Sequence, residues 1–145
     1  MANKNDQLEV KIVTPNGLAL STRAEMLAAP AVQGRVAILP HHIPFFTPLE
    51  PGEIKLKSQG KETFLAVTGG FMDVDADGKI TVLTDSAQRS EEIDEKQALK
   101  AKQEAEKLLK EREKLSEKEF SIAESSLRKA LLDLKVSRRR KKIGQ

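Results

Sequence analysis

The first 90 residues alternate apolar and polar side chains in short runs. L-E-V-K-I-V at residues 8–13 and K-I-T-V-L at residues 79–83 both follow this pattern. Because successive side chains of a strand point to opposite faces, the alternation predicts strands with one buried face. T-F-L-A-V-T at residues 63–68 is a further short run, bounded by Gly60 and by Gly69 and Gly70. Many short strands separated by turn residues predict an antiparallel β-sandwich over residues 1–90.

One turn in this region resembles a metal site. D-V-D-A-D-G at residues 73–78 matches the first half of a calcium-binding EF-hand loop. Such a loop needs a bidentate Glu at its twelfth position, where this chain has Thr84. Asp77 and Gly78 also suit a tight hairpin turn between strands. We therefore expect a solvent-exposed turn here, and no metal site.

After Ser90 the pattern takes the period of a helix. No Gly or Pro occurs from residue 91 to residue 140. Ser116, with Glu119 three residues later, forms the sequence pattern of a helix N-cap. We predict two helices, at about residues 91–114 and 117–140, joined as an antiparallel hairpin within a domain of residues 91–145. The fold class is therefore α+β, and the narrow apolar stripes predict a hairpin of marginal stability on its own.

Composition and charge limit the class of protein. The 145 residues include no Cys, which excludes disulfides and thiolate chemistry. No apolar run approaches the roughly 20 residues of a membrane span, and the polar N-terminus lacks a signal-peptide core. Residues 1–90 hold 9 basic and 10 acidic side chains (net −1), and residues 91–145 hold 16 and 12 (net +4). We expect a soluble intracellular protein with a basic helical domain.

Few residues are candidates for chemistry. His41 and His42 lie in an apolar loop, V-A-I-L-P-H-H-I-P-F-F, but adjacent side chains on an extended chain point apart, and no partner base, nucleophile or third ligand is evident. The basic tail S-R-R-R-K-K fits a solvated helix end, then an acidic protein surface, and only third a nucleic acid. These observations favour a binding module and give no candidate for an enzyme.

The motifs together resemble one known family. G-R-V-A-I-L-P-H-H-I-P-F-F-T-P-L is similar to the signature G-x-x-G-I-L-P-x-H-x-P-x-x-T-x-L of the ε subunit of rotary (F-type) ATP synthases. P-G-E-I-K-L, V-T-G-G-F-M-D-V and I-T-V-L-T-D-S-A follow in the order of that family. The resemblance covers nearly the whole chain, including the two-helix C-terminus.

The resemblance implies a non-catalytic, cofactor-free subunit of the central stalk, whose β-domain docks on the γ subunit and the membrane c-ring. The implied docking residues are Arg35, Leu39, Pro40, His42, Pro44, Gly69, Gly70 and Phe71. His42 aligns with a histidine at the γ interface, and His41 with a variable position. Arg35 stands where some members carry an acid facing the c-ring, and Ala37 replaces the usual Gly. We therefore expect loop shape and apolar surface to make most of the c-ring contact.

The resemblance also implies that the hairpin extends along γ into the catalytic αβ head and blocks ATP hydrolysis. The implied regulatory contacts are Phe120, Leu127, Arg128, Leu131, Leu134, Arg138, Arg139 and Arg140. Some members bind ATP in the hairpin through an I/L-D-x-x-R-A motif, of which this chain keeps Asp94 but has Gln97 in place of the arginine. Glu104, Lys129 and Asp133 stand where such members carry further basic residues. We therefore expect no nucleotide site.

The implied location is the cytoplasmic face of the bacterial plasma membrane, as a peripheral protein held there by the complex, with a plastid thylakoid as the second choice. The alternative is a holdase-like or scaffold module that grips protein clients with its hairpin. A nucleic-acid-binding protein is the third hypothesis, and no nucleic-acid partner is expected.

Overall fold

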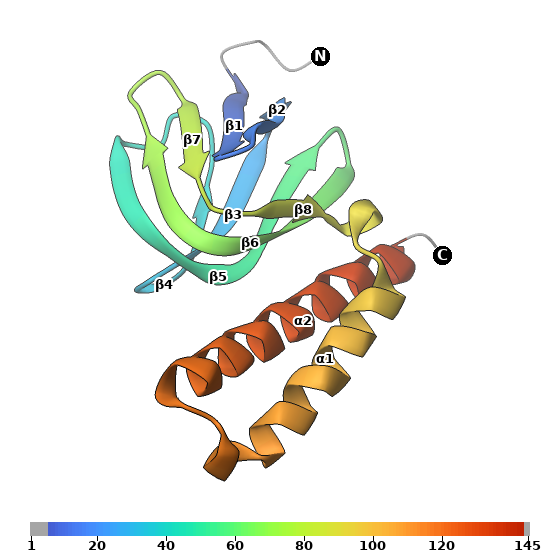
Figure 1. Cartoon of the computed structure of the whole chain (residues 1–145). Coiled ribbons are helices and arrows are strands. Elements are labelled where there is room, and N and C mark those ends of the chain that lie inside the picture. The colour runs from blue at the N-terminus through green and yellow to red at the C-terminus, as the bar shows by residue number, and fades with distance from the viewer. Residues whose placement is uncertain (1–5, 144–145) are drawn as a thin grey trace. The chain divides into compact units, whose positions relative to one another are not determined.

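The computed structural model describes residues 6–143, with side chains described up to Arg139. The chain divides into two compact units, with the division between Arg89 and Ser90. The first unit is built of strands and the second of helices (Figure 1). This observation confirms the expected α+β fold class. The side chain of Arg140, one of the expected regulatory contacts, lies outside the described residues.

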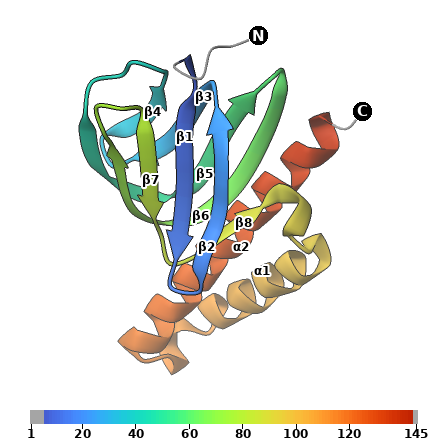
Figure 2. The ribbon, with the colours of Figure 1, turned by 90° about the horizontal axis from the view of Figure 1, so that it is seen from above.

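The first unit contains eight strands in the described residues. They are β1 (Leu8–Thr14), β2 (Gly17–Ala24), β3 (Met26–Ala31), β4 (Gly34–Ile38), β5 (Phe45–Ser58), β6 (Lys61–Val74), β7 (Lys79–Leu83) and β8 (Ala87–Arg89). Seven pair in the order β2-β1-β7-β6-β5-β3-β4, and β8 pairs with β6. β1 and β7 form the one parallel pair among the described strand pairs of this unit, and they lie side by side with β2 in Figure 2.

The alternating pattern decides which side chains form the core. In β1 the buried residues Leu8, Val10 and Ile12 alternate with exposed Glu9 and Lys11. Ile54 of β5, Leu65, Val67 and Met72 of β6, and Ile80 of β7 belong to the same apolar cluster, although β6 buries four successive residues from Phe64 to Val67. Burial of these side chains stabilises the fold by roughly 1.5–3 kcal/mol each. The period of two in the sequence therefore produces a sandwich interior.

A close contact between strands occurs at two adjacent glycines of β6. Gly69 has φ +100° and Gly70 has φ +130°, values that side-chain-bearing residues rarely adopt. A Cβ atom built on Gly70 would lie 1.9 Å from the carbonyl oxygen of Leu83 in β7. Gly70 is thus needed for the approach of β6 to β7, and the pairing of Phe71 with Leu83 follows directly after it.

The turn at residues 75–78 is a hairpin turn, as predicted. Oδ1 of Asp75 accepts hydrogen bonds from the backbone N–H of Asp77 at 2.8 Å and of Lys79 at 2.9 Å. Gly78 has φ +80°. A carboxylate of the calcium-loop pattern thus holds the backbone of the turn between β6 and β7.

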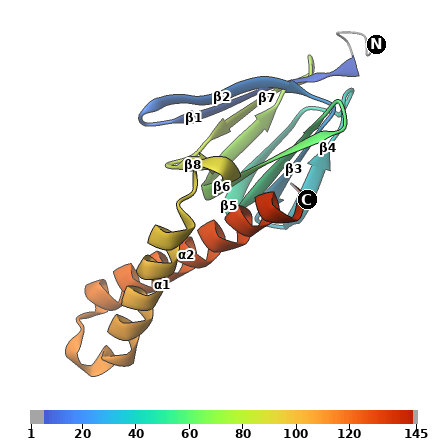
Figure 3. The same cartoon turned by 90° about the vertical axis from the view of Figure 1, so that its right-hand side faces the viewer.

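The second unit is a helical hairpin, and the predicted helix bounds need correction. It contains α1 (Glu95–Lys110) and α2 (Glu117–Ile143), with short 3₁₀ turns at Ser90–Glu92 and Arg112–Lys114. The first helix begins four residues later than predicted because Asp94 caps it, accepting from the N–H of Lys96 and Gln97. The helices lie side by side and run in opposite directions (Figure 3).

The start of α2 confirms the predicted cap. The backbone N–H of Glu119 donates to Oγ of Ser116 at 3.1 Å, and the Ser116 hydroxyl donates to Oε1 of Glu119 at 3.2 Å. The guanidinium of Arg112 lies 4.5 Å from the centre of the Phe120 ring. A cap and a cation–π contact therefore fix the turn between the helices, each contributing about 1 kcal/mol.

Small residues form much of the contact between the two helices. Ala98 and Ala105 of α1 are buried, as are Ala123 and Ala130 of α2. Each pair is spaced seven residues apart, so each pair lies on one face of its helix. Alanine lets the axes approach closely but buries little area per residue. The hairpin is consequently a lightly packed unit, whose buried apolar residues besides the alanines are Ile93, Leu134 and Val136 among the described residues.

Replacement of Gly70 tests the contact between β6 and β7. Gly70→Ala should destabilise the first unit by more than about 3 kcal/mol, because a strained φ is combined with a clash against the Leu83 carbonyl. Gly17→Ala is the matched control, since Gly17 has φ +114° but no atom lies within 4 Å of the point that its Cβ would occupy. It should cost only about 1–3 kcal/mol. Urea unfolding measures both, and equal losses would contradict the close contact.

Candidate docking site

Strand pairing places apolar side chains in one line across the outer face of the first unit. Phe71 of β6 pairs with Leu83 of β7, Leu83 pairs with Val13 of β1, and Val13 pairs with Leu18 of β2. Paired residues point to the same face of a sheet. Phe46 of β5 joins the line by stacking on Phe71, with ring centres 5.7 Å apart and planes 16° apart. We call these five residues the apolar row.

The apolar row is exposed to solvent. The exposed fractions are 62% for Phe46, 49% for Phe71, 52% for Leu83 and 59% for Leu18, and Val13 is half-buried. Single exposed apolar residues are common on protein surfaces, but a contiguous group on one face is typical of a protein–protein interface. The core residues of the same strands point inward, so the core forms without the apolar row. It is the main candidate for a binding surface.

The loop between β4 and β5 presents a second exposed surface. Leu39 is 57% exposed and Ile43 is 75% exposed. The loop is held from within: Nδ1 of His42 lies 2.6 Å from the Ile43 carbonyl oxygen, and the His42 ring meets Phe45 edge-on at 6.0 Å. His41 has φ +69°, and its Nε2 lies 3.3 Å from Oδ1 of Asp6. The histidines thus shape the loop, and its two large apolar side chains face outward.

The residues expected to dock fall into two groups, with Arg35 outside both. Phe71 belongs to the apolar row, and Gly69 and Gly70 form the bend beside it. Leu39, Pro40, His42 and Pro44 belong to the loop. Arg35 joins neither group, because its Nη1 donates to the Glu53 carbonyl oxygen at 2.7 Å and its Nη2 lies 3.9 Å from Glu53 Oε1. Arg35 thus has an internal partner in β5.

Sequence reasoning missed four members of the apolar row: Phe46, Leu83, Val13 and Leu18. The alternation places Val13, Leu83 and Phe46 on the outer side of their strands, where a polar residue is expected. An apolar residue at an outward-facing position of a strand is a signal of a binding face that the sequence alone contains. Their alignment into one row depends on the strand order and register, and the sequence pattern gives neither.

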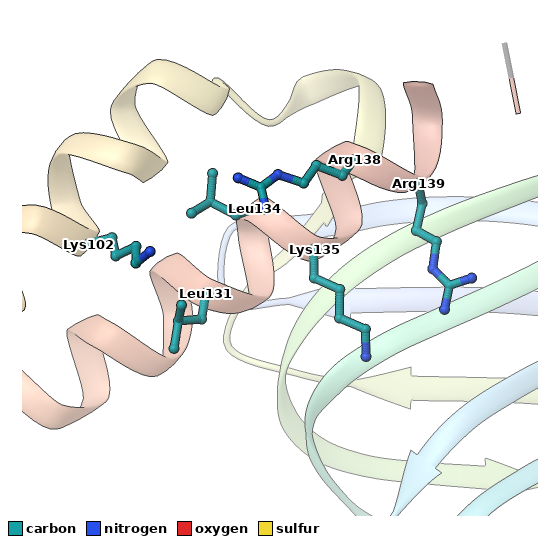
Figure 4. Close-up of a pocket in the computed structure, with 6 residues that line it drawn as sticks. All are labelled: Lys102, Leu131, Leu134, Lys135, Arg138 and Arg139. Atoms are coloured by element: carbon teal, nitrogen blue, oxygen red, sulfur yellow. The ribbon is translucent and has the colours of Figure 1, made fainter. Parts of the chain in front are cut away.

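The second unit carries a basic cavity of about 460 Å³. Lys102 of α1 and Lys135, Arg138 and Arg139 of α2 line it, together with Leu131 and Leu134. In Figure 4 the Lys135 and Arg139 side chains point away from that of Lys102. Arg138 also reaches α1, with its Nε 3.8 Å from Oε1 of Glu95. Two leucines and four cationic side chains thus line one cavity, a combination that suits an acidic, partly apolar surface.

The expected regulatory residues are partly used inside the hairpin. Leu134 is buried, Phe120 and Leu127 are half-buried, and Leu131 is 45% exposed. Arg128 lies 3.9 Å from Glu124 on its own helix, and Arg138 pairs with Glu95. Phe120, Leu127 and Leu134 are therefore at least partly covered, while Leu131, Lys135 and the described arginines remain at the surface.

The degenerate nucleotide motif has a structural role in this chain. Asp94 caps α1, so its Oδ1 is occupied by two backbone N–H groups. Of Glu104, Lys129 and Asp133, only Lys129 is a cation. Its Nζ lies 3.6 Å from Oδ2 of Asp133 on the same helix, so Asp133 neutralises its charge. Burial raises the pKa of the Asp133 carboxyl, and the Lys129 ammonium opposes that rise. Glu104 and Asp133 thus offer acceptors where a triphosphate needs donors.

The described residues hold no candidate for a metal site or a membrane span. No group of three or more His, Asp or Glu side chains that could hold a metal ion occurs among residues 6–139. None of the described helices is long and apolar enough to cross a membrane.

A β-sandwich with an exposed apolar row, joined to a lightly packed basic hairpin, defines a two-unit interaction module. Residues 7–90 match the family model of the ATP synthase delta/epsilon chain β-sandwich domain, and residues 91–138 match that of the long α-helix domain of the same chain. The chain therefore belongs to the ATP synthase delta/epsilon chain family.

Curated relatives share the family across their full length. The ATP synthase epsilon chain of Herpetosiphon aurantiacus is 39% identical over 134 residues, which cover 92% of this chain and 96% of the relative. That of Nitrosococcus oceani is 42% identical over 139 residues, which cover 94% and 97%. That of Dehalococcoides mccartyi strain BAV1 is 40% identical, covering 96% and 98%.

Solved structures share the fold. A chain of the Euglena gracilis mitochondrial ATP synthase, in a structure of OSCP, F1 and c-ring, matches with a TM-score of 0.73 and 22% identity, covering 88% of this chain and 79% of that chain. A chain of the Tetrahymena thermophila mitochondrial ATP synthase central stalk and c-ring matches with a TM-score of 0.58 and 17% identity, covering 93% and 99%.

The hairpin should not bind ATP. Isothermal titration of the full chain with Mg-ATP should show no binding up to millimolar concentrations, because the motif positions carry the uncharged Gln97, the carboxylates of Glu104 and Asp133, and a lysine paired with Asp133. The triple variant Gln97→Arg, Glu104→Arg and Asp133→Arg is the positive control for ATP binding, since it restores the cations of the motif. ATP binding by the unaltered chain at millimolar affinity or tighter would contradict this prediction.

Proposed function

We propose that this chain is a non-catalytic central-stalk subunit of a proton-translocating ATP synthase. In this function the first unit couples a γ-type subunit to the c-ring, and the second unit regulates ATP hydrolysis. Membership of the family and the epsilon-chain relatives from bacteria support the assignment. The protein would then be peripheral, held by the complex at the cytoplasmic face of the bacterial plasma membrane.

The apolar row carries the docking part of the proposal. Covering apolar side chains that are about half-exposed stabilises a complex by roughly 25 cal/mol per Å², less the entropy of association. Aromatic residues such as Phe46 and Phe71 are enriched at the centres of interfaces. The row is the larger continuous apolar surface of the unit and suits the γ-type subunit. The loop with exposed Leu39 and Ile43 is a second apolar surface, and it also carries His42, which the resemblance places at the γ interface.

The regulatory part of the proposal rests on the light packing of the hairpin. The buried residues of the hairpin are mostly alanines, which each bury little area, so another surface can compete for the same stripe. The cavity lined by Lys102, Lys135, Arg138 and Arg139 supplies cationic groups that can pair with an acidic surface of the catalytic head. Exposed ion pairs contribute only about 0.2–1 kcal/mol each, so Phe120, Leu127 and Leu131 must supply much of the hold.

The first unit should suffice for binding to the γ-type subunit of the source cell. A fragment of residues 1–90 should fold and form a 1:1 complex in pull-down and calorimetry. Phe46→Asp should weaken that complex at least 100-fold, because a charge would be buried in the apolar contact.

Val32→Asp is the matched control, since Val32 is 46% exposed but lies in the turn between β3 and β4, outside the apolar row. It should leave the affinity within threefold. Loss of binding by a folded fragment, or capture of heterogeneous proteins in place of the γ-type subunit, would contradict the proposal and favour the scaffold alternative.

Removal of the second helix should release ATP hydrolysis. Deleting residues 116–145 should leave the complex assembled and able to synthesise ATP, while its rate of ATP hydrolysis rises severalfold. Arg138→Glu with Arg139→Glu should do part of the same, and less so at high salt, because surface charges are screened. The measurement is the ATPase rate of reconstituted complex at matched occupancy. An unchanged rate after the deletion would show that the hairpin is no inhibitor.

A further inference from the structure

A cavity of about 410 Å³ lies at one end of the apolar row. It is bounded by the turn between β1 and β2, the bend of β6 and the end of β7. Its lining residues are Val13, Thr14, Pro15, Gly70, Phe71, Leu83, Thr84 and Asp85. We call it the rim cavity. Three members of the apolar row, Val13, Phe71 and Leu83, form its walls, so any partner that covers the row also meets the cavity.

The hydroxyls that line the rim cavity are already satisfied. Thr84 is buried, its N–H donates to the Val13 carbonyl oxygen at 3.1 Å, and its hydroxyl donates to the Ser86 carbonyl oxygen at 3.2 Å. The Thr14 hydroxyl donates to the Gly17 carbonyl oxygen and accepts from the N–H of Asn16, both at 3.2 Å. Neither hydroxyl therefore requires a polar group of a ligand, and the cavity presents an essentially apolar interior.

Asp85 is the one charged residue among those that line the rim cavity. Asp85 is exposed, and its carboxylate forms no hydrogen bond or ion pair in the part of the chain that the structure describes. It directly follows Thr84, and it is an exposed member of the residues that line the cavity. A partner that fills the interior with an apolar group gains by placing a cation beside this carboxylate.

The size of the cavity limits its occupant. A buried anchor of an interface is typically one large side chain in a pocket, surrounded by weaker contacts. About 410 Å³ of open cavity accommodates one such side chain with adjoining backbone, and is small for a helix or a strand.

We propose that the rim cavity receives one large apolar side chain of the partner subunit that covers the apolar row, and that Asp85 pairs with a Lys or Arg next to that side chain. This inference rests on the proposed function, because the partner is the γ-type subunit. The rim cavity then sets the register of the partner along the row, whereas the row itself supplies most of the buried area.

The test measures the affinity of the full chain for the purified γ-type subunit. Val13→Phe should fill the cavity and weaken binding at least tenfold, because the partner's side chain loses its place. Asp85→Asn should weaken binding about two- to fivefold and reduce the dependence of the affinity on salt. Asp77→Asn, in the hairpin turn between β6 and β7, is the matched control for loss of an exposed carboxylate and should have no effect.

The outcomes separate the two proposals. If Phe46→Asp abolishes binding while Val13→Phe and Asp85→Asn leave the affinity unchanged, the row is the docking face and the rim cavity is no anchor site. If Phe46→Asp also has no effect, the docking role itself is wrong. Asp85→Lys keeps the test decisive if Val13→Phe fails to fold, since Asp85 is exposed and the charge reversal should weaken binding more than tenfold. Unchanged affinity for that variant overturns the inference.

Discussion

The pairing of Phe71 with Leu83 is the contact on which the outer face of the first unit depends. It aligns β6 with β7, and through β7 it aligns β1 and β2, so that one register places Phe71, Leu83, Val13 and Leu18 side by side. A slip of one residue in β7 would turn Leu83 inward and Val82 outward. Gly70 makes this register possible, because any Cβ there would collide with the Leu83 carbonyl.

The two units use their apolar residues in different ways. The strands divide theirs between a closed core and an exposed row, so the first unit is stable while part of its apolar surface remains free. The second unit buries mainly alanines, with Ile93, Leu134 and Val136, and leaves Leu131 exposed. The different periodicities of strand and helix thus produce a closed β-sandwich with an exposed apolar row and a lightly packed hairpin in the same chain.

The period of two predicted the strands, and the Asp77-Gly78 pair predicted the hairpin turn, because local chemistry decides both. The Ser116 cap was predicted for the same reason. The start of α1 was placed too early, because residues 91–93 suit a helix but Asp94 bonds to the N–H groups of Lys96 and Gln97 and ends any helix before it. The resemblance indicated Phe71 and the loop. It could not indicate Leu18 or Leu83, because their place in the row follows from pairings between residues far apart in the sequence.

The most direct test of the docking role uses the absence of cysteine from the chain. Single cysteines at Leu18 and Leu83 report exposure of the row, and one at Lys61, beside the turn between β5 and β6, reports an exposed site outside it. The rate of reaction with a maleimide is measured for the free chain and for the complex with the γ-type subunit. We expect at least tenfold slower labelling of both row positions in the complex, with Lys61→Cys unchanged. Equal labelling of the row positions in the free and bound states would contradict the docking role.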